Sequence, residues 1–68
     1  MGSQEQLGKK IKKARQKAEL TQVQVAEKAG IHVNYYARIE RGEENPSFDV
    51  IESIAKALKV KSSEILPF

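Results

Sequence analysis

The stretch from Gln22 to Arg41, QVQVAEKAGIHVNYYARIER, decides the fold of this 68-residue chain. Its pattern predicts two short helices joined by one tight turn. Two helices that cross steeply through such a turn need a small residue where they nearly touch, and a glycine where φ becomes positive. Ala26 meets the first need and Gly30 the second. The apolar residues that fasten this helix-turn-helix to a core are Val25, Ala29, Ile31, Tyr36 and Ile39.

The second helix of this stretch has two chemically different faces. At about 100° per residue, Tyr36 and Ile39 lie about 60° apart and are expected to face inward. The residues on the opposite side are Asn34, Ala37, Arg38 and Arg41. Asparagine matches the major-groove edge of adenine, and arginine matches that of guanine. Without the neighbouring turn, these side chains would indicate an ordinary solvated surface. Next to the turn, they indicate a helix face that contacts the base edges of DNA.

The rest of the chain predicts further helices and no strand. Helical spacing of apolar residues and capping signals place helices over residues 4–18, 21–29, 32–41, 47–58 and 62–66. Thr21 and Ser47 are expected to cap helix N-termini, and Gly30 and Gly42 to end helices. The sequence therefore predicts an all-α, compact bundle of five short helices. It forms one domain over residues 4–68, with residues 1–3 set aside as a possible cloning remnant.

The predicted core combines the inner sides of these helices. The first helix contributes Leu7, Ile11, Ala14 and Ala18. The fourth helix contributes Phe48, Ile51, Ile54, Ala55 and Leu58. The final turn is expected to return Ile65 or Leu66 to this core.

Composition excludes several classes of function. The chain has no cysteine, and its one histidine, His32, has no carboxylate cluster at ligand spacing, so we expect no disulfide and no metal site. No apolar run approaches the roughly 20 residues of a membrane span. No paired carboxylates, nucleophile–base set or phosphate-binding loop is present, so the sequence predicts a non-enzyme without cofactor or small-molecule ligand. These features favour a cytoplasmic protein.

Basic residues gather at one end of the chain. Residues 1–20 hold six basic and two acidic side chains, whereas residues 21–68 hold six and seven. Such a block can attract a polyanion, and it is equally typical of a solvated helix face.

Three segments together resemble a known family. They are LTQVQVAEKAGI at residues 20–31, YARIERG at residues 36–42 and NPS at residues 45–47. The chain resembles the phage repressor/Cro family, or XRE-type regulators, over about residues 7–66. The resemblance implies a lambda-repressor-like DNA-binding domain and a sequence-specific, double-stranded DNA-binding transcriptional regulator, here a repressor. The chain has Lys59 where the family usually has a glycine after the fourth helix.

The resemblance also implies roles for individual residues. The base contacts it implies are Val33, Asn34 and Arg38. The phosphate contacts it implies are Gln22, His32, Tyr35, Arg41, Asn45 and Ser47. Arg15 and Glu40 match a family ion pair that fixes the recognition helix. The acidic Glu43 and Glu44 lie near the expected DNA side, where they would repel phosphate unless they tilt away.

The apolar tail raises the question of a second subunit. Because one helix-turn-helix binds DNA weakly and dimers align two half-sites, we expect a homodimer on an inverted repeat, with half-site centres about 34 Å apart. The expected interface is Ile65, Leu66 and Phe68; the alternative is that the tail folds onto its own core. The alternative function is an antitoxin or bridging-type adaptor that binds a partner protein as well as, or instead of, DNA.

Overall fold

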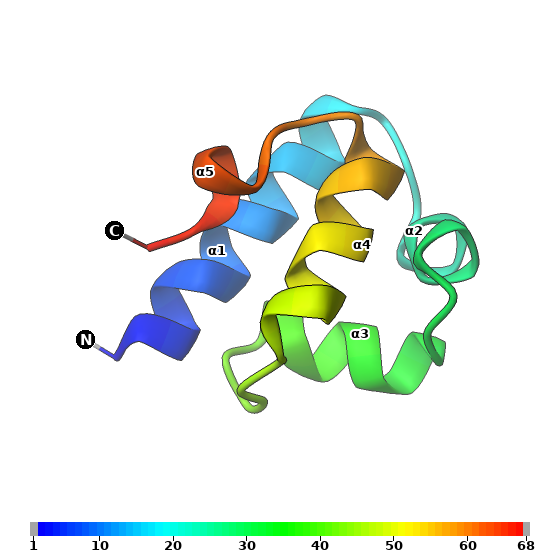
Figure 1. Ribbon diagram of the computed structural model, residues 1–68. Helices are drawn as coiled ribbons and strands as arrows, with labels where there is room; N and C mark the ends of the chain where they lie inside the picture. The colour runs from blue at the N-terminus through cyan, green and yellow to red at the C-terminus, as the bar shows by residue number, and fades with distance from the viewer. Residues whose placement is uncertain (1, 68) are drawn as a thin grey trace.

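The computed structural model describes residues 2–67, and these form five helices and no strand, as the sequence predicts. The helices are α1 (Ser3–Lys17), α2 (Gln22–Ala29), α3 (Val33–Glu40), α4 (Phe48–Leu58) and α5 (Ser62–Ile65). In Figure 1, α4 lies across the middle of the bundle, α3 runs beneath it, and the two chain ends lie on the same side. Over the described residues, none of the helices has the length and apolarity that crossing a membrane requires.

The predicted capping residues begin and end the helices. Thr21 and Gln24 form a capping box in which the Gln24 N–H donates to Thr21 Oγ1 at 3.1 Å and the Thr21 N–H donates to Gln24 Oε1 at 2.8 Å. Ser47 Oγ accepts from the Val50 N–H at 3.3 Å and begins α4. Gly30 adopts φ +74°, so α2 ends in the left-handed conformation that the turn requires. Lys59 ends α4 with φ +59°, the left-handed conformation without the usual glycine.

One continuous core lies between the helices. Its buried members are Leu7, Ile11, Val25, Ala26, Tyr36, Ile39, Ile51, Ile54, Ala55, Ala57, Leu58 and Ile65. Ala26 is 1% exposed, so the small residue of the motif lies inside this core. Tyr36 and Ile39 are fully buried, so α3 presents its predicted inner side to this core.

Two predicted core residues lie outside it. Phe48 is 56% exposed, because it is the first residue of α4 and the apolar stripe enters the core only from Ile51 onward. Ala18 is exposed, because α1 ends at Lys17 and the helical stripe does not continue beyond it. Conversely, Ile65 is 1% exposed and packs in the core of its own chain.

A glycine inside α1 sets the distance between α1 and α3. Gly8 is buried in α1, and a Cβ atom there would lie 2.5 Å from the backbone oxygens of both Ile39 and Glu40. Any larger residue would push α3 away from α1. The position of α3 therefore depends on the missing side chain at Gly8.

Candidate nucleic-acid interface

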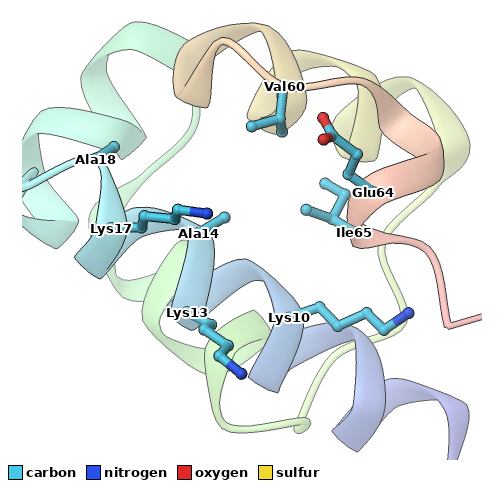
Figure 2. Close-up of a pocket in the computed structure, with 8 residues that line it drawn as sticks. All are labelled: Lys10, Lys13, Ala14, Lys17, Ala18, Val60, Glu64 and Ile65. Carbon is cyan, nitrogen blue, oxygen red and sulfur yellow. The ribbon is translucent and has the colours of Figure 1, made fainter.

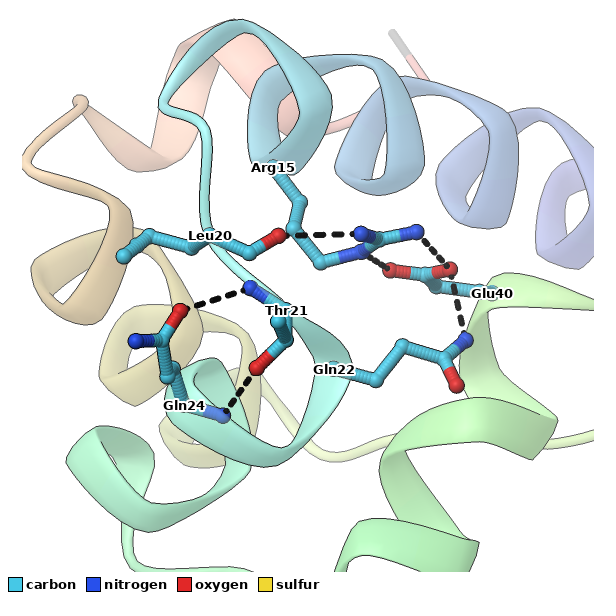
Figure 3. A network of polar contacts seen from close by, with 6 residues as sticks. All are labelled: Arg15, Leu20, Thr21, Gln22, Gln24 and Glu40. Carbon is cyan, nitrogen blue, oxygen red and sulfur yellow. Dashed lines mark hydrogen bonds and ion pairs between the residues drawn. The ribbon is translucent and has the colours of Figure 1, made fainter.

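A buried network fixes α3 to α1 and α2. Arg15 donates from Nε to Glu40 Oε2 at 2.6 Å and from Nη2 to Oε1 at 3.2 Å. Gln22 Nε2 donates to the same carboxylate at 3.0 Å, and Arg15 Nη1 donates to the Leu20 carbonyl at 3.0 Å. Figure 3 shows these side chains converging from three segments of the chain. The Glu40 carboxylate thus joins α3 to both neighbouring helices.

Burial makes this ion pair a structural element. The side chains of Arg15 and Glu40 are 14% and 2% exposed. Burial alone would raise the pKa of Glu40, but hydrogen bonds, led by those from Arg15, outweigh it and hold the pKa below its ordinary value. The hydrogen bond to Glu40 raises the pKa of Arg15. Both groups are therefore ionised at neutral pH, and the pair that the resemblance implies lies inside the fold, where it anchors α3.

Tyr36 lies beside this network without joining it. Its hydroxyl is buried and has no hydrogen bond of standard geometry to any of residues 2–67, although the Glu40 carboxylate is close by. Burial, together with that carboxylate, raises the pKa of the phenol, so the hydroxyl stays protonated. Tyr36 contributes its ring to the core.

The outward side of α3 carries the polar side chains that the helical wheel predicts. Asn34 is exposed, and the side chains of Arg38 and Arg41 are 42% and 57% exposed. Val33 and Tyr35 are half-buried and pack against the core, so they offer less surface than the other predicted DNA contacts. An exposed amide and two guanidinium groups therefore share the outward face of α3 and its end.

His32 begins α3 as its N-cap. The Asn34 N–H donates to His32 Nδ1 at 3.0 Å, and His32 itself is exposed. In the neutral ring that accepts at Nδ1, the proton lies on Nε2. His32 thus presents an N–H donor to solvent at the start of the helix.

The other predicted phosphate contacts keep donors that a phosphate can use. Gln22 is half-exposed, and its amide nitrogen has a second N–H besides the one donated to Glu40. Ser47 is exposed and accepts from Val50, which leaves its own O–H to donate. Asn45 is exposed in the loop between α3 and α4.

The acidic pair in that loop lies beside the arginines at the end of α3. Glu44 pairs with Arg38, and Glu43 pairs with Arg41. Arg38 Nε donates to Glu44 Oε2 at 2.9 Å. Arg41 donates from Nε to Glu43 Oε2 at 2.9 Å and from Nη2 to Oε1 at 3.3 Å. This hydrogen bonding raises the pKa of Arg41 and lowers that of Glu43.

The basic block of α1 lines a different surface. A pocket between α1 and α5 is lined by Lys10, Lys13, Lys17 and Glu64, together with small and apolar side chains from both segments (Figure 2). No residue of α2, α3 or the loop after α3 contributes to it. Lys10 Nζ also donates to the Leu66 carbonyl at 3.0 Å. Lys10, Lys13 and Lys17 therefore line a surface to which the outward face of α3 does not contribute.

The fold and this surface agree with a known family. The helix-turn-helix family model matches residues 11–65, so the chain belongs to this family of transcriptional regulators. Two relatives are the immunity repressor protein of Bacillus phage phi105, 45% identical over 60 residues, and the control protein C.BamHI of Bacillus amyloliquefaciens, 39% identical over 62 residues. The first is named as a repressor and the second as a control protein.

The relatives differ in length. The matched residues cover 88% of this chain and 42% of the immunity repressor, but 90% of this chain and 76% of C.BamHI. Among solved structures, the restriction-modification controller protein C.AhdI from Aeromonas hydrophila superposes with a TM-score of 0.90 at 27% identity. That match covers 93% of this chain and 96% of C.AhdI. The helical arrangement is therefore the one found in a regulator of similar size.

Proposed function

We propose that this chain is a sequence-specific regulator that binds double-stranded DNA as a homodimer on an inverted repeat, with α3 in the major groove, and that it represses transcription. One observation carries the proposal: α3 is locked to α1 and α2 through Glu40 on its inner side and presents Asn34 and Arg38 on its outer side. A rigid helix with an exposed amide and guanidinium is suited to contact base edges.

We assign the residues around α3 to two kinds of contact. Asn34 and Arg38 contact bases, and Val33 contributes a smaller apolar contact at the start of the helix. The phosphate contacts are Gln22, His32, Tyr35, Arg41, Asn45 and Ser47. These side chains surround the outward face with donors, and donors to phosphate set the register of a protein on DNA without distinguishing sequences.

The proposed dimer uses the tail differently from the sequence expectation. Ile65 is 1% exposed and packs in the core of its own chain, so we leave it out of the proposed interface. Leu66 keeps part of its surface and lines a recess together with Phe48 and Pro67. Phe68 lies outside the described residues. We propose that the exposed Phe48 and the half-buried Leu66 contact the second subunit.

The regulatory role follows the relatives. The phage phi105 relative is called an immunity repressor, and the relative C.BamHI comes from a bacterium, Bacillus amyloliquefaciens. Bacterial DNA lies in the cytoplasm, so we place the protein there. Repression is the simplest outcome when a small protein occupies an operator.

A salt series tests the proposed function. An operator obtained by random-sequence selection is titrated with the protein, and a scrambled duplex of equal length serves as the control. Binding to the operator should be tighter, and affinity should fall at least about tenfold between about 50 and 200 mM salt, because phosphate contacts release counterions. Equal affinity for both duplexes, or no response to salt, contradicts the proposal.

A further inference from the structure

Glu44 holds the Arg38 side chain at one atom only. The carboxylate accepts from Nε at 2.9 Å, and neither Nη1 nor Nη2 of Arg38 has a hydrogen bond to another of the described residues. The Glu44 side chain is 34% exposed, less than the 42% of Arg38. The terminal nitrogens Nη1 and Nη2 are therefore available for another contact, while Nε is held by Glu44.

The loop that carries Glu44 is itself fixed to α3. The Gly42 N–H donates to the Ile39 carbonyl at 3.0 Å, and the Glu43 N–H donates to the Arg38 carbonyl at 2.9 Å. Gly42 has φ +79° and packs so closely on α1 that an added Cβ would lie 3.0 Å from Glu5 Cα. Pro46, two residues after Glu44, is buried. The main chain thus holds Glu44 next to Arg38, and the carboxylate reaches Arg38 Nε.

This geometry matches what a guanine contact requires. Guanine presents two acceptors, O6 and N7, on its major-groove edge, and arginine contacts both with two N–H groups. With Nε held by Glu44, Nη1 and Nη2 remain as such a pair. We propose that Glu44 is a positioning residue that orients Arg38 toward guanine and thereby increases discrimination at that base pair, an inference that rests on the proposed DNA-binding function.

The neighbouring pair provides an internal contrast. Glu43 engages Nε and Nη2 of Arg41 together, and both side chains are more than half exposed. Arg41 follows the last residue of α3 and is assigned to phosphate. A phosphate contact does not distinguish bases. Removing Glu43 should therefore change the affinity for all DNA sequences alike, whereas removing Glu44 should change the preference among them.

The expected effect follows from the freedom of the arginine side chain. Ordering one flexible side chain at an interface reduces affinity by about three- to tenfold, and a side chain that is already held avoids most of this loss. Without Glu44, the Arg38 side chain becomes ordered only when it contacts guanine, and this ordering reduces the affinity for the duplex that contains the guanine. Discrimination at the guanine should fall by about three- to tenfold, while a lost negative charge raises affinity for every duplex.

The test measures base discrimination in a small set of variants. Selection with the wild-type chain and with Arg38→Ala first identifies the guanine that depends on Arg38. The ratio of Kd values for duplexes with and without this guanine is then measured for Glu44→Ala, Glu44→Gln and the matched control Glu43→Ala, and for Glu44→Ala combined with Arg38→Ala. Urea unfolding verifies that every variant is folded.

A positioning role predicts one pattern. Glu44→Ala loses discrimination, while Glu44→Gln keeps most of it, because the amide oxygen still accepts from Nε. Glu43→Ala keeps the wild-type ratio of Kd values. Glu44→Ala does not change this ratio further once Arg38 is alanine.

Three results would overturn the inference alone: an unchanged ratio in Glu44→Ala, an equal loss in Glu44→Gln, or a loss that persists without Arg38. A selection in which Arg38→Ala changes no guanine also overturns it. A wild-type chain that binds selected and scrambled duplexes equally overturns the proposed function and this inference together.

Discussion

Two arginine–glutamate pairs on opposite sides of α3 have the same chemistry and different consequences. Arg15 and Glu40 lie on the inner side, 14% and 2% exposed, whereas Arg38 and Glu44 lie on the outer side, 42% and 34% exposed. A buried pair leaves an uncompensated charge in the protein when one partner is removed, but an exposed pair leaves a charge that water solvates. The inner pair therefore holds the helix in place, and the outer pair is free to serve a ligand.

The largest expected effect comes from breaking the inner pair. Glu40→Ala should lower the free energy of unfolding by about 3–5 kcal/mol, because Arg15 loses its buried partner. The matched change on the outer side, Glu44→Ala, should alter stability by no more than about 0.5 kcal/mol. Urea unfolding of both variants measures the difference. Similar losses of unfolding free energy in Glu40→Ala and Glu44→Ala would contradict the expectation that the buried pair stabilises the fold more than the exposed pair.

The next effect concerns the contact of α1 with α3. Gly8→Ala places a Cβ atom against two backbone oxygens of α3, and overpacking of this kind costs about 1–3 kcal/mol. Inside a helix, alanine is otherwise more favourable than glycine by about 1 kcal/mol. A loss of stability in Gly8→Ala is therefore attributed to the packing conflict. Gln16→Ala, at an exposed position of the same helix, is the control. Both are measured by thermal unfolding. A more stable Gly8→Ala variant would argue against the close approach.

The pH dependence of stability provides a smaller effect on the same inner pair. The pKa of Glu40 is lower in the folded chain than in the unfolded chain. Its contribution is therefore fully present above the unfolded pKa and is lost as pH falls through the folded pKa. The free energy of unfolding should decline in acid more steeply for the wild type than for Glu40→Gln, which has no carboxylate to titrate. Parallel pH curves would contradict this account.

Much of the fold could be predicted because its signals are local. Caps at Thr21 and Ser47 and the left-handed turn at Gly30 depend on a few neighbouring residues. Gly8 also had a local signal, since a glycine inside a helix is unfavourable and often has a packing reason. That reason involves residues more than thirty positions away, so periodicity alone does not find it.

The arrangement of the interface was harder to predict. The wheel placed Asn34 and Arg38 outward, and the family resemblance supplied the Arg15–Glu40 pair. The pairing of Glu44 with Arg38 depends on how the loop after α3 closes on that helix, which no local pattern encodes. The direction of Phe48 depends on where the first turn of α4 meets the core. These features follow from tertiary packing.

Random-sequence selection with the wild-type chain and with Arg38→Ala tests the central claim most directly, namely that the outward face of α3 determines sequence preference. The account predicts that the wild type enriches an inverted repeat with a guanine in each half-site. Arg38→Ala should keep the half-site spacing and lose that guanine. The same guanine in both selections, or no enriched sequence for the wild type, would contradict the account.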